Sequence, residues 1–136
     1  MTLVEQLIRD EGLLLHPYAD SVGKLTIGIG RNLTDVGISQ AEATYLLTND
    51  IQTAVDHLAT ALPWTVTLDE VRHAALVNMT FNMGIGGLCG FKKFLAVMQV
   101  GDWRVAQSEM LSSKWAEQVG GRAHRLALQI ETGLWQ

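Results

Sequence analysis

The most informative stretch of the chain is RDEGLLLHPYADSVGKLTIGIGR, residues 9–31. It opens in the last turn of a helix that the apolar spacing predicts from residue 2 onward and that Gly12 ends. An alternating, glycine-spaced run follows at residues 24–30, which predicts a short, twisted hairpin. One helix end, one loop and one small β element therefore lie within some twenty residues of one another in sequence.

Two carboxylates flank the loop in contrasting surroundings. Glu11 sits at the negative end of the helix dipole and precedes three leucines at 13–15, so both charge and desolvation favour its protonated form. Asp20 follows in a polar loop that favours the ionised form. One protonated and one ionised acid is the pair that glycoside hydrolysis uses. The residues alone leave open that Glu11 is an ordinary helix-end residue and Asp20 a turn former.

The glycines of TIGIGR also suggest a dinucleotide-binding turn. That fingerprint needs a third glycine at position 33, where this chain has Leu33, and a following helix, where NLTDVG predicts a turn. We therefore reject it and expect Gly28 and Gly30 to permit close approach of a ligand or of another backbone segment. Thr26 should direct its hydroxyl group toward the loop that carries Asp20.

The remainder of the chain is predicted to be helical. Ser39 and Glu42 form a capping-box pattern that opens a long helix, and Pro63 stops it. A second such pattern, Thr67 with Glu70, opens a helix that is apolar on nearly all sides and should be the central one. Shorter helices are expected around 91–100, 102–111 and 113–119, with a last one closed by Gly133. The fold class is therefore mainly α (α+β), with a small antiparallel β element and a carboxy-terminal helical bundle.

Composition narrows the classes of function. Of the 136 residues, 48% are hydrophobic and 18% charged, which is typical of a globular domain with a core of its own. Residues 1–62 hold three basic and eight acidic residues, a net −5, and residues 63–136 hold seven and six, a net +1. No Lys/Arg cluster could follow a phosphate backbone, so we expect no nucleic-acid partner. No apolar run is long enough to span a bilayer, and the charged amino terminus does not match a signal peptide.

Other chemistry-bearing residues are expected to be structural. None of the four histidines has metal-ligand spacing, so no metal and no other cofactor is predicted. His16, next to Pro17, is expected in a loop. The single cysteine, Cys89, lies in an apolar, glycine-rich segment and should be a packing residue. The four tryptophans, all between residues 64 and 135, are interpreted as core residues.

Four segments together resemble the phage-type lysozymes of glycoside hydrolase family 24. They are EGLLLHPYADSVGKLTIGIGR, NMTFNMG, GFKKFLAVMQVGDW and SSKWAEQVGGRAHRLALQIETGLW, and they occur in the family's order from about residue 3 to 135. The resemblance implies a single lysozyme-like domain over 1–136 with two lobes. The small lobe is expected at about 13–60, and the helical lobe at about 1–12 and 61–136.

The resemblance also implies roles for five residues. Glu11 matches the general acid that protonates the leaving glycosidic oxygen, and Asp20 matches the second carboxylate. Thr26 matches the threonine that positions the attacking water. Arg122 matches an arginine near the catalytic glutamate, and Phe81 matches a groove-lining aromatic residue, although a core position for Phe81 stays open.

The chain departs from the family pattern at several positions. Arg31 replaces a histidine that pairs with an acid on the next helix, and Asp50 is the matching acid, so an Arg31–Asp50 ion pair is expected. Phe94 and Glu109 replace the usual polar types at two groove positions, which affects the outer subsites. The short segment between Arg31 and Ser39 predicts a reduced sheet.

The resemblance implies a monomeric endolysin, a muramidase that cleaves the β-1,4 bond between N-acetylmuramic acid and N-acetylglucosamine in peptidoglycan during phage-induced lysis. It would be made in the host cytoplasm without stable membrane association. It would reach the periplasmic wall through a separate membrane protein. Two other functions stay open: a lytic transglycosylase, and a non-catalytic peptidoglycan-binding virion module.

Overall fold

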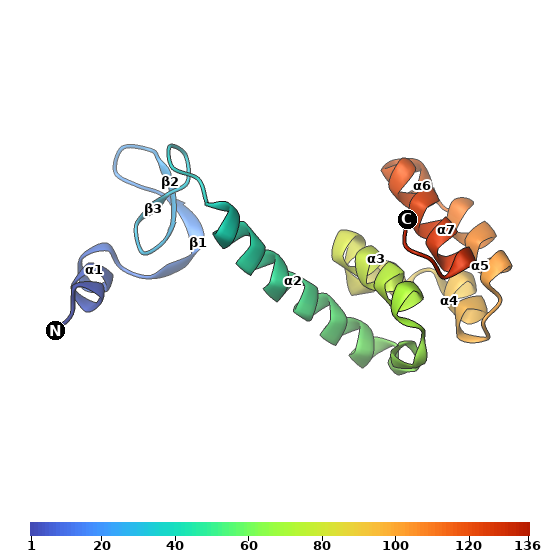
Figure 1. Cartoon of the computed structure of the whole chain (residues 1–136). Helices are drawn as coiled ribbons and strands as arrows, with labels where there is room; N and C mark the ends of the chain where they lie inside the picture. The colour runs from blue at the N-terminus through green and yellow to red at the C-terminus, as the bar shows by residue number, and fades with distance from the viewer. The chain divides into compact units, whose positions relative to one another are not determined.

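A computed structural model describes residues 1–136 and divides the chain into two compact units (Figure 1). The first unit is Met1–Leu46 and the second is Leu47–Gln136. The boundary falls within the helix α2 (Gln40–Ala61), whose first turns belong to the first unit. The architecture is mainly helical with one small antiparallel sheet, as the sequence predicts. Assignment of residues 1–12 to the helical lobe stays a prediction.

The first unit begins with α1 (Leu3–Glu11), which has the caps expected of its sequence. Thr2 and Glu5 form a reciprocal capping box, in which the Thr2 amide donates to Glu5 Oε2 at 2.7 Å and the Glu5 amide donates to Thr2 Oγ1 at 3.2 Å. Gly12 ends the helix with a φ of +78°, a conformation that glycine adopts at little cost. The predicted end of the first helix is therefore confirmed.

The sheet has the order β1-β2-β3, from β1 (Leu14–Ala19), β2 (Leu25–Gly28) and β3 (Arg31–Asn32). The expectation that His16 lies in a loop was wrong, because β1 runs through it. Proline cannot donate a ladder hydrogen bond, but β1 is an edge strand and its register is irregular between Leu14 and Tyr18. Pro17 lies within this irregular stretch, so the strand tolerates it.

Helix α2 begins with the predicted capping box. The Ser39 amide donates to Glu42 Oε1 at 2.9 Å, and the Glu42 amide donates to Ser39 Oγ at 3.1 Å. The helix stops before Pro63, as expected, and a 3-10 helix, η1 (Pro63–Thr67), follows.

The second predicted capping box is wrong. Asp69 caps α3 (Glu70–Cys89) and accepts from the Arg72 amide at 3.0 Å. Thr67 belongs to the preceding 3-10 helix, where its hydroxyl donates to the Trp64 carbonyl at 2.8 Å. Since Asp69 is two residues nearer the helix, its carboxylate reaches the free amides that Thr67 cannot.

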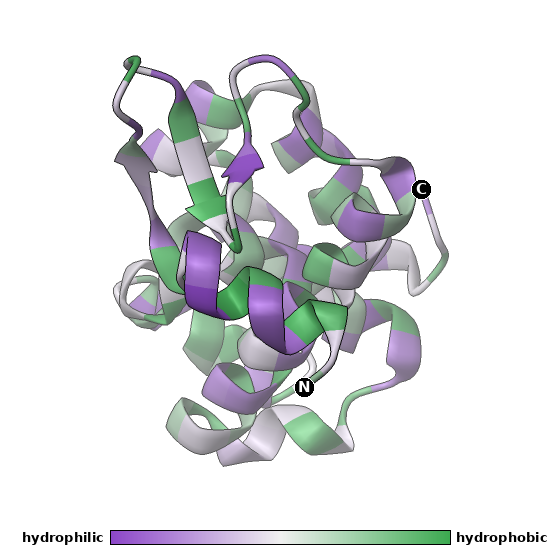
Figure 2. Ribbon diagram, turned by 90° about the vertical axis from the view of Figure 1, so that its left-hand side faces the viewer, coloured by the Kyte–Doolittle hydropathy of each residue, from purple (hydrophilic) through white to green (hydrophobic).

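The second unit is the helical bundle, coloured green to red in Figure 1. Helix α7 contacts α3, α5 and α6, and α5 also contacts α4. Figure 2 shows apolar and polar segments alternating along the helices of the chain, as in helices that bury one face. The helices that follow α3 are α4 (Lys92–Gln99), α5 (Trp103–Leu111), α6 (Lys114–Val119) and α7 (Gly121–Thr132), close to the predicted ranges.

The core of the bundle forms one cluster. Its large members are Leu58, Leu76, Met79, Leu88, Phe94, Leu95, Met98, Met110, Trp115, Leu126 and Ile130. Three of the four tryptophans fit the core expectation, since Trp115 is buried and Trp64 and Trp103 pack against the cluster. Trp135 does not, because it is 62% exposed after the last helix has ended.

No single helix has the length and hydropathy to cross a bilayer, although α3 and α4, bent by 105° at their junction, pass that test as a pair.

Candidate functional site

Asp20 is held in the turn between β1 and β2 by the backbone of that turn. Its Oδ1 accepts from the amides of Val22 at 3.0 Å and Lys24 at 2.8 Å. The backbone closes the same turn, since the Asp20 amide donates to the Lys24 carbonyl at 2.9 Å. Both side-chain hydrogen bonds use one carboxylate oxygen, and Asp20 is half-buried. Oδ2 is therefore the oxygen left for a ligand.

Thr26 lies two residues after the turn, in the central strand. It pairs with Tyr18 on one side and Asn32 on the other, and it is 4% exposed. Its hydroxyl donates to the Lys24 carbonyl at 3.0 Å. The Lys24 backbone thus bonds to both Asp20 and Thr26, which confirms that the Thr26 hydroxyl is directed toward the Asp20 loop. Because the hydroxyl hydrogen is used, Thr26 Oγ1 can act toward a ligand only as an acceptor.

Glu11 is the last residue of α1 and is exposed. Its carboxyl group lies directly against Gly30, in the turn between β2 and β3. A β-carbon placed on Gly30 would be 2.8 Å from Glu11 Oε2 and 3.0 Å from Cδ. A glycine of TIGIGR does permit close approach, but the group that approaches is the Glu11 side chain rather than the expected ligand or backbone segment.

Arg31 pairs with Glu42, so the expected pairing with Asp50 was wrong. Arg31 Nη1 donates to Glu42 Oε1 at 2.8 Å and to the Gly37 carbonyl at 3.2 Å. Glu42 already faces this region because its carboxylate caps the start of α2, whereas Asp50 lies more than two helical turns further on. The Arg31 hydrogen bond, together with those from Ser39, lowers the pKa of Glu42 to about 2.

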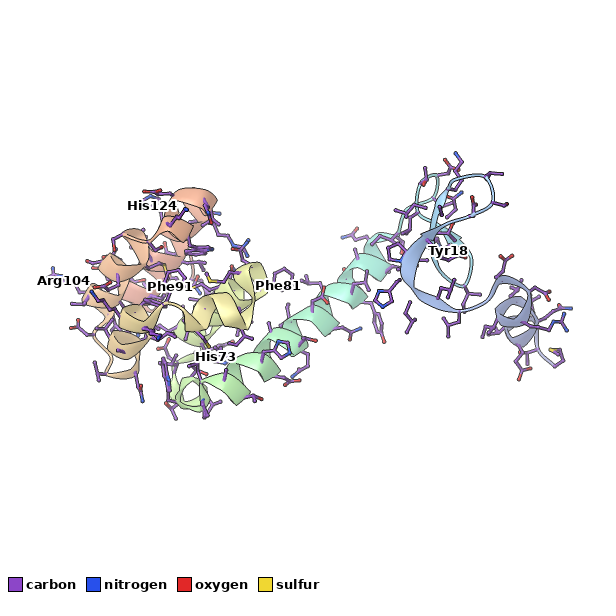
Figure 3. The ribbon with its side chains drawn as sticks, turned by 180° about the vertical axis from the view of Figure 1, so that it is seen from behind. Tyr18, His73, Phe81, Phe91, Arg104 and His124 are labelled. Carbon is purple, nitrogen blue, oxygen red and sulfur yellow. The ribbon has the colours of Figure 1, made fainter.

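Phe81 and Arg122 belong to the second unit, where they line one pocket of about 480 Å³. Phe81 is 46% exposed on α3 (Figure 3), so its alternative assignment to the core is wrong. Arg122 is fixed by Asn78, whose Oδ1 accepts from Nε at 2.9 Å and from Nη2 at 2.7 Å. Much of the pocket wall is aliphatic, so the exposed rings of Phe81 and Trp135 are the parts suited to stack on a sugar.

Sequence reasoning missed Asn78, and it singled out Gly30 without identifying Glu11 as the group that approaches it. Asn78 precedes Phe81 by three residues on α3, so helical spacing alone could have placed them on one face. The contact of Gly30 with Glu11 had only the Gly-x-Gly spacing as its signal.

Phe94 and Glu109, the unusual groove positions, line a separate pocket of about 330 Å³ with Lys92, Lys93 and Ser112. Phe94 is 1% exposed and therefore contributes mainly to the core. No group of three or more His, Cys, Asp or Glu side chains is arranged to hold a metal ion.

Comparison with known proteins gives a consistent result. A family model described as phage lysozyme matches residues 9–129. The pre-baseplate central spike protein Gp5 of Enterobacteria phage T4 is 33% identical, over 98% of this chain but 28% of that protein. Probable T4-type lysozyme 1 of Dictyostelium discoideum is 28% identical, over 97% of this chain and 95% of that protein. The SAR-endolysin of Escherichia phage Mu is also 28% identical, over 96% of this chain and 77% of that protein.

Proposed function

The chain belongs to the phage lysozyme family, and we propose that it hydrolyses the β-1,4 bond between N-acetylmuramic acid and N-acetylglucosamine in peptidoglycan. The observation that carries this proposal is the construction of the first unit. There, one turn holds Asp20 by two amides and also binds the hydroxyl of Thr26. Such an arrangement can orient one water molecule beside an ionised carboxylate without any cofactor.

Glu11 is proposed as the general acid. Its protonated carboxyl group would give its proton to the glycosidic oxygen as the bond to the anomeric carbon breaks. Its exposure leaves it accessible to a glycan strand.

Asp20 and Thr26 are proposed to hold the attacking water. The water would donate one hydrogen to Asp20 Oδ2 and the other to Thr26 Oγ1, leaving an oxygen lone pair for the anomeric carbon. Asp20 would take a proton as the new bond forms, while Glu11 has lost one, so one proton exchange with solvent resets the pair. A water held in this way favours inversion at the anomeric carbon.

Phe81 and Arg122 are proposed as substrate-binding residues. The exposed ring of Phe81 offers a stacking face, and the two hydrogen bonds from Arg122 to Asn78 keep the guanidinium ordered. The proposed biological role is lysis of a bacterial host by degradation of its cell wall. The protein would be made in the cytoplasm and reach the wall through a separate membrane protein.

The test compares wild type with Glu11→Gln and Asp20→Asn on Gram-negative cells with a permeabilised outer membrane. Both substitutions are isosteric, and the amide oxygen introduced by Asp20→Asn can still accept the two turn hydrogen bonds. We expect each variant to lose about 10²–10⁴-fold in the rate of clearing, roughly the contribution of a positioned acid or base. Mass spectrometry of the wild-type products should find reducing-end muropeptides. Anhydro-muropeptides, with activity surviving in Asp20→Asn, would show a lytic transglycosylase instead.

A second candidate follows from the likeness to the central spike protein, of which this chain spans only 28%. In that case the chain would act on the wall as part of a virion rather than free. A non-catalytic form of this role predicts that wild type sediments with purified peptidoglycan, that Glu11→Gln binds equally well, and that neither protein releases fragments.

A further inference from the structure

Gly30 and Gly28 are two glycines at and beside one turn, with nearly the same φ angle and different surroundings. Their φ angles are +69° and +70°. Around Gly28 a β-carbon would meet no atom within 4 Å, whereas at Gly30 it would collide with Oε2, Cδ and Cγ of Glu11 at 2.8–3.2 Å. The positive φ favours glycine at both positions, but only Gly30 also packs against a carboxyl group.

The contact bounds the Glu11 side chain on one side. Within residues 1–46 the Glu11 carboxyl group makes no hydrogen bond or ion pair, and it lies against the backbone of Gly30. Gly30 is itself held between β2 and β3, whose residues Ile27 and Arg31 pair across the turn. The sheet therefore presents a fixed surface to the end of α1.

We infer that Gly30 is a positioning residue for Glu11, which keeps the carboxyl group in one orientation and removes water from one of its sides. The inference rests on the proposed function, in which Glu11 must deliver a proton to one oxygen of the substrate. A proton donor displaced by about 1 Å can cost on the order of 10²-fold in rate. A side chain at position 30 displaces Glu11 by steric overlap, and glycine is the one residue that does not.

The experiment compares Gly30→Ala with Gly28→Ala, which places alanine at the same positive φ without the contact. Scanning calorimetry should show that both variants lower Tm by roughly 3–8 °C because alanine is strained at a positive φ. Gly30→Ala should lose a further few degrees. In a Glu11→Ala background that additional loss should vanish, because the colliding side chain is absent. If Gly30→Ala still lowers Tm by more than Gly28→Ala in the Glu11→Ala background, the collision with Glu11 is not the cause and the inference is overturned.

Activity and spectroscopy give the second readout. On soluble peptidoglycan strands, Gly30→Ala should lower kcat about 10- to 100-fold with KM little changed, and Gly28→Ala should keep kcat within about threefold of wild type. The ¹³Cδ resonance of Glu11, identified by its absence in Glu11→Gln, should move in Gly30→Ala and stay in Gly28→Ala. Equal kcat in the two alanine variants would overturn the positioning role while leaving the proposed function intact.

Inactive wild type would have a different meaning. It would overturn the proposed function, and with it the catalytic consequence of the contact. The calorimetric and NMR comparisons would still report whether Gly30 holds Glu11, so the two failures are distinguishable.

Discussion

Arg72 links three helices of the bundle, and its removal should cost more stability than that of any exposed arginine. Nε donates to the Ile130 carbonyl at 2.6 Å, and Nη2 donates to the Glu131 carbonyl at 3.0 Å. Both acceptors are near the carboxyl end of α7, where free carbonyls and the helix dipole favour a cation. The guanidinium also lies 4.2 Å from the ring centre of Trp103 on α5.

The magnitude follows from these contacts. Hydrogen bonds from a charged group contribute about 1.5–3 kcal/mol, and a cation–π contact about 0.5–2 kcal/mol when partly desolvated. The Arg72 side chain is only 15% exposed, so solvent screens it little. Because the contacts share one side chain and are not additive, we expect Arg72→Met to lower the free energy of unfolding by about 2–4 kcal/mol. Methionine keeps the aliphatic stem, and the amide of residue 72 still bonds to Asp69.

Tryptophan fluorescence is a suitable probe, because all four tryptophans lie in the second unit. At about 2.1 cal/mol/K per residue, 136 residues give roughly 0.3 kcal/mol per degree. A loss of about 3 kcal/mol is then a fall in Tm of about 10 °C. Arg104→Met, on the outer side of the bundle (Figure 3), is the matched control and should change Tm by less than about 2 °C.

Arg72→Lys separates charge from geometry. Lysine keeps the charge, but its ammonium cannot bond to two carbonyls and stack on Trp103 as a planar guanidinium does. It should therefore recover less than about half of the stability that Arg72→Met loses. A loss below about 1 kcal/mol in Arg72→Met, or one no larger than that in Arg104→Met, would mean that these contacts do not hold the three helices together.

Three further predictions concern single contacts. The pKa of Glu42, lowered from 4.5 to about 2 chiefly by Arg31, means that its stabilising effect is complete above pH 4.5 and is lost as the pH falls toward 2. A ¹³C titration should place its midpoint near 2, and Arg31→Met should return it toward 4.5. Asn82→Leu leaves the indole of Trp115 without its 2.8 Å acceptor and should cost about 1–3 kcal/mol in urea denaturation. Met79→Ala, at a position with no exposed surface, should cost about 2–5 kcal/mol in the same assay; a loss under about 1 kcal/mol would contradict the burial.

Local features of this protein were readable from its sequence. The end of α1 at Gly12, the Ser39–Glu42 capping box and the stop before Pro63 depend on residues within four positions of one another. Contacts between residues so close in sequence cost little loop-closure entropy, so the sequence pattern specifies them directly. The turn that holds Asp20 is of the same kind, since its partners lie two and four residues away.

Contacts between elements required the tertiary structure. The family resemblance predicted Asp50 as the partner of Arg31, whereas the path of the chain after β3 brings Glu42 to it. Likewise, Gly30 and Glu11 are nineteen positions apart in sequence. Their contact depends on how the turn between β2 and β3 packs against the end of α1. The sequence was enough to predict the helices, a few of their caps and the family. Only tertiary packing determines which side chains contact one another, because hydrophobic periodicity specifies the buried face of an element but not the partner that this face contacts.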